Sequence, residues 1–511
     1  MPKNFYITTP IYYPSANLHL GHAYTTVVAD VIKRYKKMSG YNTYFVTGTD
    51  EHGQKIEKKA FENNETPIEF VNKQVEKIIF LWDKLGIQYD KFIRTTQPNH
   101  EKTVQKIFTK LYKEGLIYKG NYDGLYCESC EEYLTLSNIE EGVCKVCKLK
   151  PIKLSEENYY FKVTAFKNFI IKYLNDNPNF VSPEKIKKEV MNNFLENNLS
   201  DLSITRSSIK WGINIKEDDK HTIYVWFDAL SNYLTALDYL NDNDSSKINL
   251  MEQFWSDDTE IVQFFGKEIS RFHIIYWPSM LKALNLRMPT TLIAHGWILF
   301  KDGKMSKSRN NVIDPLELMA EYSRDALRLF LTSEISYEKD GIYSNEIFFD
   351  FYNNVLANNI GNLSSRVINM AKKYFDSKIP DVESIDSEFY DLIKNTIKKY
   401  KINMDKFDVS NAIKVVIDLS KYANKFIEET KPWVMAKEKN ITALSKNITA
   451  LSYVNVVISF LLSPVLIDGT LKNLNLFDIN LNDLSFDNIT NYKIVIGKTI
   501  KNSEILYQRK I

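Results

Sequence analysis

Two short motifs that lie far apart in the sequence constrain the fold most strongly, because they would have to meet at one ligand. The first, His19-Leu20-Gly21-His22, follows a strand-like segment and opens a helical pattern. Imidazoles, a closely approaching glycine and the amides of a helix N-terminus all suit phosphate groups. The second, Lys304-Met305-Ser306-Lys307-Ser308, carries two flexible cations in a polar loop. Together they predict a split ATP site, as in an enzyme that activates a carboxylate.

Each motif also has an ordinary explanation. A histidine pair at a helix start is more often a surface or capping pair, and most lysine-rich pentamers are solvated loops. The strand–turn–helix context favours a functional role for the histidines. The presence of the histidine motif upstream in the same chain favours a functional role for the lysines. The run Gly266-Lys267-Glu268 lacks the flanking residues of a Walker A motif, which disfavours a P-loop fold.

Strand-like and helical segments alternate in the first part of the chain. This alternation predicts an α/β fold with a parallel sheet, in which ligands bind beyond the carboxyl ends of the strands. From about residue 353 the helical period dominates, which predicts an α-helical bundle. We expect strands at 5–8, 44–46, 222–227, 261–265 and 291–294, a loop at 47–53, and helices at 23–38, 68–85 and 268–284.

The four cysteines of the chain all lie in one short segment, as the pairs Cys127/Cys130 and Cys144/Cys147. Two C-x-x-C pairs at this spacing suit a tetrahedral Zn²⁺ with four thiolates. A filled shell leaves no position for a reacting water, so the metal would be structural. The alternative is a redox dithiol, which the doubled pair disfavours.

Size and composition indicate an ordinary globular protein. A chain of 511 residues should form about three domains. The net charge of +2 means that any nucleic-acid surface must be a local basic patch. The N-terminus has no signal-like run, and the most apolar stretch, 453–467, is too short and polar for a bilayer. We expect a buried core helix there and a cytoplasmic protein.

Two further groups of residues are weaker indications. Near predicted strand ends, aromatic and polar residues could line an apolar pocket, although ordinary aromatic core is a strong alternative; they are Trp226, Asp228, Tyr233, His295 and Trp297. In the helical part, Asn362, Arg366 and Trp433 could contact unpaired bases, whereas a buried bundle tryptophan is the commoner case.

In combination these residues resemble the methionyl-tRNA synthetase family of class I aminoacyl-tRNA synthetases. The likeness covers nearly the whole chain and includes the lysine-serine loop without change. It is carried by 8–17 with the histidine motif, 47–53, 224–230, 265–268, 294–297, 304–308, 362–366 and 431–433.

The resemblance implies a Rossmann-like parallel-sheet catalytic domain with a zinc-binding insertion, followed by an α-helical anticodon-binding bundle. The expected ranges are 1–115 and 222–300 for the catalytic halves, 116–221 for the insertion, 301–350 for the mobile lysine loop and stem-contact region, and 351–511 for the bundle. The insertion is too short for an editing domain of the kind found in the leucine, isoleucine and valine enzymes.

The resemblance also assigns roles to individual residues. The catalytic residues would be His19, His22, Lys304 and Lys307, with Gly21, Gly266 and Lys267 also binding ATP. The methionine pocket would be formed by Ile11, Tyr13, Asp50, Trp226, Leu230, Tyr233 and His295, with Asp50 taking the ammonium group. The anticodon readers would be Asn362, Arg366 and Trp433, and one structural zinc would be held by Cys127, Cys130, Cys144 and Cys147. Glu268 stands where the family usually has Asp.

The implied reaction joins methionine to tRNA(Met). ATP with Mg²⁺ would give methionyl-adenylate, which the terminal ribose of the tRNA would then attack. The chain ends near Tyr507, where the family's catalytic-plus-anticodon body ends, so the expectation is a monomer that lacks the dimerising C-terminal module and binds no membrane. The alternatives are a class I synthetase for another amino acid, a small-molecule nucleotidyltransferase, and a zinc-stabilised RNA-binding protein without catalysis.

Overall fold

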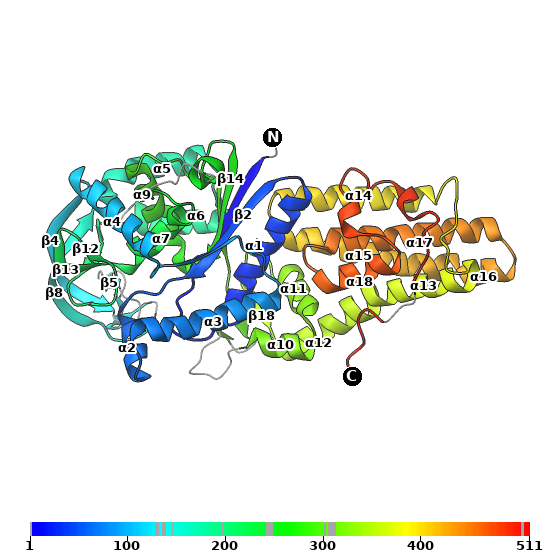
Figure 1. Ribbon diagram of the computed structural model, residues 1–511, viewed down its shortest axis with the longest axis horizontal. Coiled ribbons are helices and arrows are strands. Elements are labelled where there is room, and N and C mark those ends of the chain that lie inside the picture. Colours follow the sequence, from blue (N-terminus) through cyan, green and yellow to red (C-terminus); the bar gives the residue numbers. More distant parts are fainter. Residues whose placement is uncertain are drawn as a thin grey trace.

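The computed structural model describes residues 3–127, 132–134, 139–145, 147–196, 199–241, 249–300, 303–304, 313–501 and 505–511. Figure 1 shows an elongated molecule with a sheet-containing half and a helical half. The predicted combination of a parallel sheet with an α-helical bundle is confirmed.

Six parallel strands form the central sheet, in the order β3-β2-β1-β14-β15-β9. The chain first runs outward through β2 and β3 and later returns to the other side of β1. The order therefore reverses between β1 and β14, and open α/β sheets bind ligands at this kind of switch point. The strands are β1 (Asn4–Thr8), β2 (Asn42–Thr49), β3 (Lys91–Arg94), β9 (Val181–Ser182), β14 (Thr259–Gly266) and β15 (Thr291–His295).

Helices connect these strands, and their ends follow local capping signals. Helix α3, for example, begins with a capping box between Thr66 and Glu69 and ends at Gly86, whose φ of 70° suits glycine. The helices of this half are α1 (Leu20–Met38), α2 (Gln54–Glu62), α3 (Pro67–Leu85), α4 (Pro98–Lys113), α7 (Val225–Thr235), α8 (Leu250–Phe254) and α9 (Trp277–Ala283).

Three local predictions were wrong or too simple. The expected strand 222–227 is the end of β13 (Asp218–Ile223), outside the central sheet, followed by α7 from Val225. This run is apolar on both faces, so its period could not separate strand from helix. The expected loop 47–53 begins late, because β2 continues to Thr49. The expected helix 268–284 contains a 3-10 turn (Lys267–Ile269) and a π-helical turn (Phe272–Tyr276) before α9.

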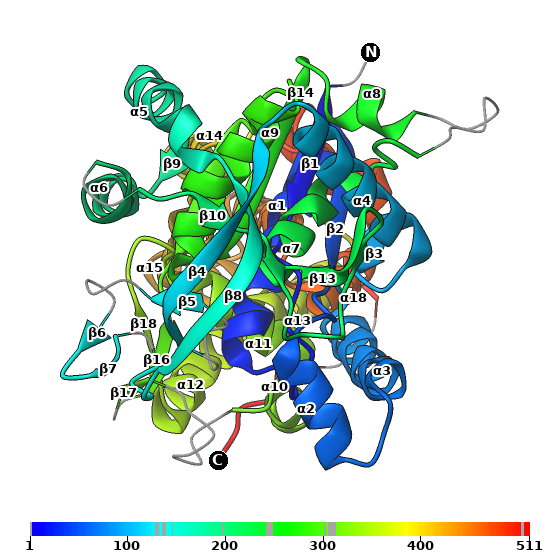
Figure 2. The ribbon, with the colours of Figure 1, turned by 90° about the vertical axis from the view of Figure 1, so that its left-hand side faces the viewer.

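The insertion is built around a long antiparallel pair, β4 (Ile117–Cys127) and β8 (Ile152–Phe161), seen in Figure 2. Strand β9, which lies within the expected insertion range, joins the edge of the central sheet beside β15. The remaining elements are β5 (Glu132–Leu134), β6 (Ile139–Glu140), β7 (Val143–Cys144), a 3-10 turn (Val163–Phe166), α5 (Lys167–Asp176), α6 (Glu184–Val190), a π-helical turn (Met191–Leu195), β10 (Leu202–Ser203), β11 (Thr205–Arg206) and β12 (Asn214–Ile215).

A small sheet precedes the helical half. It pairs β16 (Ile298–Phe300) with β17 (Gly303–Lys304) and β18 (Gly341–Tyr343). Residues 305–312, with Lys307, lie outside the described residues, and only the backbone of Lys304 is described. Helices α10 (Pro315–Glu321) and α11 (Arg324–Ser333) lie between β17 and β18, and Asp314 caps α10 by accepting a hydrogen bond from the amide of Leu316.

The bundle packs around α17 (Ile441–Leu462), which is buried along most of its length. Within the described residues, this is the one helix long and apolar enough to span a bilayer, but 89% of its most apolar window is buried inside the protein. The predicted core helix is therefore confirmed. The other bundle elements are α12 (Asn345–Phe351), a π-helical segment (Tyr352–Gly361), α13 (Asn362–Phe375), α14 (Ser387–Asp405), α15 (Val409–Thr430), α16 (Pro432–Lys437), α18 (Ile467–Leu476) and 3-10 turns at Leu481–Asp483 and Tyr492–Val495.

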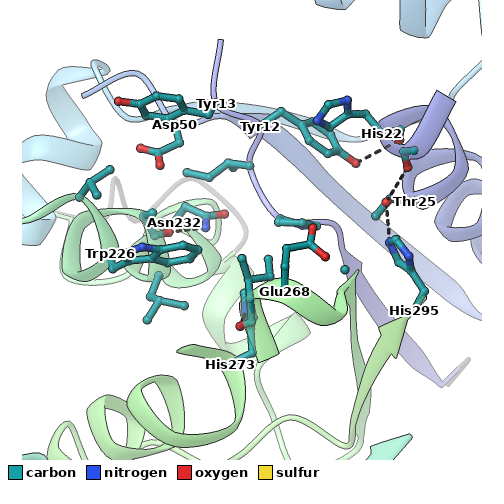
Figure 3. Close-up of a pocket in the computed structure, with 18 of the residues that line it drawn as sticks. Tyr12, Tyr13, His22, Thr25, Asp50, Trp226, Asn232, Glu268, His273 and His295 are labelled. Carbon is teal, nitrogen blue, oxygen red and sulfur yellow. Dashed lines mark hydrogen bonds between the residues drawn. The ribbon is translucent and has the colours of Figure 1, made fainter. Parts of the chain in front are cut away.

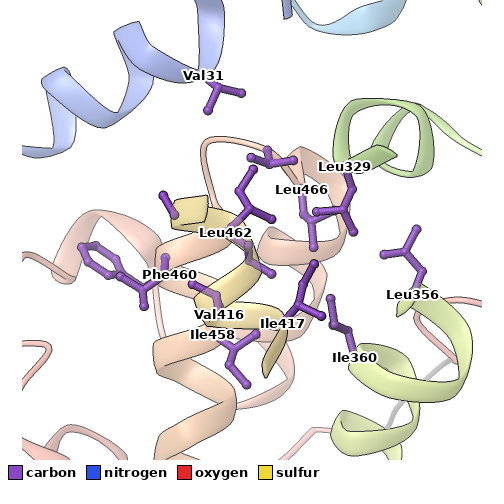
Figure 4. Packing of buried hydrophobic residues seen from close by; sticks show 14 of the residues in the cluster. Val31, Leu329, Leu356, Ile360, Val416, Ile417, Ile458, Phe460, Leu462 and Leu466 are labelled. Atoms are coloured by element: carbon purple, nitrogen blue, oxygen red, sulfur yellow. The ribbon is translucent and has the colours of Figure 1, made fainter. Parts of the chain in front are cut away.

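A buried ion pair joins the two halves. Arg328 on α11 contacts Asp30 on α1 at 2.6 Å, and neither side chain is exposed. The same guanidinium donates to the carbonyls of Leu85, Pro464 and Val465. These bonds connect the helix that begins with the histidine motif to the turn after α17. The surrounding apolar residues, including Val31, Leu329, Leu462 and Leu466, belong to one continuous core (Figure 4).

Candidate functional site

A cavity of about 450 Å³ lies at the switch point of the central sheet, as Figure 3 shows from close by. Its walls come from segments far apart in the sequence. They are the loop after β1, the first turns of α1, the loop after β2, one face of α7, the irregular helix after β14 and the residues that follow β15. The parallel topology brings these segments together, because the carboxyl ends of the strands share one edge.

The histidine motif lines this cavity at the start of α1. His19 is the N-cap residue, and its Nδ1 accepts a hydrogen bond from the Gly21 amide at 3.1 Å. The Nδ1 of His22 accepts from the His19 amide at 3.0 Å. A ring nitrogen that accepts a backbone N–H carries no proton, so each neutral ring must carry its proton on Nε2. The capping bonds thus make both histidines Nε2–H donors.

Gly21 has a role that the sequence did not indicate. A Cβ atom at this position would lie 3.0 Å from Cε1 of His19, which is tighter than ordinary packing. The glycine therefore leaves room for the His19 ring to fold back over the helix start. Two of the amides expected to bind an anion are instead used by the imidazoles, so the motif can offer ring N–H groups in their place.

All seven residues predicted for the amino-acid pocket line the same cavity: Ile11, Tyr13, Asp50, Trp226, Leu230, Tyr233 and His295. Trp226 stacks on Phe272 with ring centroids 3.7 Å apart. Figure 3 shows Asp50, Tyr13 and Trp226 toward one end, and His22, Thr25 and His295 toward the other. The cavity thus combines a carboxylate and aromatic rings at one end with imidazoles at the other.

His295 is fixed between the sheet and α1. Its Nε2 lies 2.7 Å from Oγ1 of Thr25, and its Nδ1 lies 2.7 Å from the Gly296 carbonyl. The ring stacks on Phe264, with centroids 5.1 Å apart. Burial lowers the pKa of His295. A neutral ring donates from Nδ1 to the carbonyl and accepts the Thr25 hydroxyl at Nε2.

Several wall residues were missed from the sequence, because neither their chemistry nor the resemblance assigned them a role. They are Tyr12, Lys55, Asn232 and His273. His273 is buried in the π-helical turn, stacks on Phe265, and faces the hydroxyl of Tyr233 with its Nε2 at 2.7 Å. Burial lowers the pKa of His273 to about 4, so this ring is neutral and accepts the tyrosine proton.

The residues after β14 are divided between the cavity and its rim. Gly266 and Glu268 line the cavity, whereas Lys267 does not. Nζ of Lys267 contacts Asp340 at 2.6 Å and lies 4.2 Å from the centre of the Trp297 ring. Among the predicted ATP-binding residues whose side chains the structure describes, Lys267 is the one that does not line the cavity and instead pairs with Asp340.

The cysteines approach one another in the insertion. Cys127 and Cys147 have their sulfur atoms 3.3 Å apart, and the sulfur of Cys144 lies within 4.8 Å of both. A disulfide would need about 2.05 Å, whereas sulfur ligands of one zinc are separated by several ångström. Cys130 lies outside the described residues. The three described thiols form a donor set that fits a zinc ion.

The three residues predicted to read bases lie on the bundle surface. Asn362 donates to Asn424 at 3.2 Å, and Arg366 pairs with Glu428 at 2.6 Å, both between α13 and α15. Trp433, on α16, is 43% exposed. The alternative of a buried bundle tryptophan is therefore wrong, and an indole that large on the surface is available for stacking.

Comparison with known proteins gives one consistent family. The family described as tRNA synthetases class I (M) matches residues 5–147 and 136–368. The methionine–tRNA ligase of Caldanaerobacter subterraneus subsp. tengcongensis is 43% identical over all of this chain and 79% of its own length. That of Ureaplasma parvum is also 43% identical, over all of this chain and 98% of its own length.

Solved structures agree. The Mycobacterium tuberculosis methionyl-tRNA synthetase in complex with methionyl-adenylate aligns with a TM-score of 0.93 and 29% identity, over 99% of this chain and 100% of that one. Its apo form aligns with a TM-score of 0.87 and 26% identity, over 100% of this chain and 99% of that one. By sequence and by structure, this chain belongs to the methionyl-tRNA synthetase family of class I aminoacyl-tRNA synthetases.

Proposed function

We propose that the cavity at the switch point binds methionine and ATP, forms methionyl-adenylate, and presents it to the 3′-terminal ribose of tRNA(Met). The observation that carries this proposal is that the histidine motif and all seven residues predicted for the methionine pocket line one cavity of about 450 Å³. The likeness to a relative bound to methionyl-adenylate, with a TM-score of 0.93, supports it.

At one end of the cavity, Asp50 would hold the substrate ammonium through its carboxylate. The methionine side chain would lie against α7, where Trp226, Leu230 and Tyr233 provide aromatic and apolar surface. A thioether is polarisable and makes favourable contacts with aromatic rings. Tyr13 and Ile11 would complete the enclosure at this end, and His295, which lies beside Thr25, would close the cavity from the opposite end.

At the other end, His19 and His22 would donate from Nε2 to phosphate oxygens, next to Gly21 and Gly266. Lys304 and Lys307 would bring positive charge to the pyrophosphate as it leaves, and Lys267 would join them on release from Asp340. Mg²⁺ bound to the phosphates would supply further charge neutralisation. The methionine carboxylate would attack the α-phosphate and pyrophosphate would leave; the ribose 2′-hydroxyl would then attack the activated carbonyl and AMP would leave. The residues act by positioning and by charge stabilisation.

The remaining parts support this chemistry. Cys127, Cys144 and Cys147, completed by Cys130, would hold one structural zinc in the insertion. Asn362, Arg366 and Trp433 would read the anticodon, with the catalytic halves, insertion, lysine loop and bundle divided as the sequence indicates. A cytoplasmic location goes with the need for tRNA. The monomeric state stays a prediction, and sedimentation velocity at micromolar concentration tests it.

The proposal is tested by methionine-dependent ATP–pyrophosphate exchange. Asp50→Ala should raise the KM for methionine while the KM for ATP changes little, because the ammonium loses its partner. Lys307→Ala should lower kcat far more than it raises the methionine KM, because its charge serves the leaving group. Equal losses in both parameters for both variants would refute the assigned roles. Absence of exchange in the unaltered enzyme would refute the proposal itself.

A further inference from the structure

A fully buried His–Asp–His cluster lies behind the cavity and has no part in the proposed reaction. Asp228 is 0% exposed, His52 is 2% exposed and His100 is 1% exposed. Oδ2 of Asp228 lies 2.7 Å from Nδ1 of His52, and its Oδ1 lies 2.5 Å from Nε2 of His100. One carboxylate therefore joins two imidazoles from different elements.

The cluster connects the two walls of the amino-acid pocket. Trp226, Leu230 and Tyr233 follow one another at helical spacing on the cavity face of α7, whereas Asp228 does not line the cavity. His52 lies two residues after Asp50, whose carboxylate does line it. The contact between His52 and Asp228 thus ties the loop that carries Asp50 to the back of the helix that carries the aromatic wall.

The loop and α7 each make further hydrogen bonds with neighbouring elements. The buried carboxylate of Glu51 accepts a hydrogen bond from Nε of Arg94 at 2.7 Å. The backbone carbonyl of Glu51 accepts one from Nε1 of Trp211, also at 2.7 Å. His100, which lies on α4, binds α7 at a second point, because its Nδ1 lies 2.8 Å from Oγ1 of Thr235. These bonds fix the loop and the helix to their surroundings, and Asp228 lies at the contact between them.

The charges strengthen this contact. Burial alone would raise the pKa of Asp228, but His52 and His100 outweigh it and the pKa is lowered. Burial would likewise lower the pKa of His52, yet Asp228 outweighs it and the pKa is raised, with Glu101 and Glu51 adding to the effect. These shifts favour the carboxylate of Asp228 and the protonated ring of His52 over their neutral forms, and removal of one partner leaves the other buried without it.

We propose that Asp228 is a positioning residue for the amino-acid substrate. Through His52 it sets the distance between the Asp50 carboxylate and the Trp226–Tyr233 face, and so selects the length of side chain that fits between them. This inference rests on the proposed function, since it takes Asp50 as the ammonium partner. A cluster that only stabilised the fold would leave this selection unchanged.

The test compares His52→Ala with His52→Asn in methionine-dependent pyrophosphate exchange. Asparagine places its Nδ2 donor where the imidazole Nδ1 stands, so it can keep the bond to Asp228. His52→Ala should raise the methionine KM about tenfold, since small displacements of a positioning group are costly. His52→Asn should recover most of that loss, and the KM for ATP should stay within about twofold in both.

A length series reads the selection directly. Ethionine is one carbon longer than methionine, and S-methylcysteine has one methylene fewer before the sulfur. His52→Ala should reduce the preference for methionine over both, measured as ratios of kcat/KM. His221→Ala is the matched control, because His221 is also 2% exposed but lies in β13 away from the cavity. That variant should keep the ratios of the unaltered enzyme.

The positioning role and the proposed function can be refuted separately. If Asp50→Ala raises the methionine KM but His52→Ala leaves both the KM and the selectivity ratios unchanged, the positioning role is refuted and the proposed function stands. If His52→Ala lowers kcat equally for all amino acids without altering the ratios, the cluster is structural only. If Asp50→Ala has no effect on the methionine KM, the proposed subsite itself is wrong.

Discussion

The catalytic half and the helical half are held together by different physics. Around the cavity, buried polar groups such as Asp228, Glu51 and His273 are paired by hydrogen bonds with specific partners. In the bundle, most of the buried side chains of α17 are apolar and belong to one continuous core with residues such as Val416 and Ile417 (Figure 4). Hydrogen bonds depend steeply on distance and angle, whereas apolar packing is non-directional. Substitutions around the pocket should therefore mainly impair substrate binding. Substitutions in the bundle should mainly lower the free energy of unfolding.

The junction between the halves combines both kinds of interaction. The Asp30–Arg328 pair is fully buried, yet it lies within a continuous apolar core. It is the place where a single polar substitution should have the largest effect on stability.

Replacing Arg328 with Met should therefore be the most damaging change. It leaves Asp30 buried without its main cation and removes donors from three carbonyls. We expect a loss of about 3–5 kcal/mol in the free energy of unfolding, the usual cost of breaking a buried pair. Urea unfolding followed by circular dichroism measures it. Adding Asp30→Asn should recover part of the loss, and a single variant as stable as the parent would contradict the assignment.

Within the bundle, Leu462→Ala should cost about 3 kcal/mol, because Leu462 is 0% exposed and its removal leaves a cavity. The methionine KM in pyrophosphate exchange should not change, since the residue lies far from the pocket walls. A variant that lost methionine affinity as strongly as stability would show that the two halves are not separable in this way.

The pH dependence of stability should carry a contribution from His273. Its pKa is about 4 in the folded protein, against an ordinary value near 6.5, so the unfolded chain binds more protons between these values. Stability is then present above pH 6.5 and falls as the pH is lowered toward 4, by about 1.5 kcal/mol between pH 6.5 and 5 for this group. His273→Gln should remove that part of the slope. An unchanged slope would show that the ring titrates normally.

The smallest effect on stability is expected at the exposed tryptophan of α16. Trp433→Ala should change the free energy of unfolding by less than about 0.5 kcal/mol, as surface substitutions usually do. It should strongly reduce aminoacylation of tRNA(Met) while pyrophosphate exchange stays intact. Leu471→Ala is a matched control, since Leu471 is an exposed apolar residue on α18. If both variants aminoacylate tRNA(Met) equally well, Trp433 is not part of the surface that binds the tRNA.

Sequence patterns predicted those features of the fold that depend on residues close together in the chain. The apolar runs of β1 and β14, the N-terminus of α10 and the cysteine spacing all follow from neighbouring residues. The run from Val225 to Phe227 was misassigned because it is apolar on both faces, and only tertiary contacts make it a helix. The partners of Asp228 are separated from it by 176 and 128 residues, so no local pattern could pair them.

The same limit explains the residues missed in the cavity. Asn232 and His273 belong to helices whose apolar spacing masks them, and Lys55 lies in the first turn of a surface helix. The predicted pocket residues were found through family likeness, whereas these became visible through the shared edge of the sheet. Gly21 leaves room for the His19 ring, and this role is likewise visible only in the folded structure.

Pyrophosphate exchange with each amino acid in turn tests the central claim most directly, because it reads the pocket without the tRNA surface. We expect exchange that depends on methionine and is lost or weakened in Asp50→Ala. Exchange that depended instead on leucine or cysteine, or that was absent with every amino acid, would contradict it.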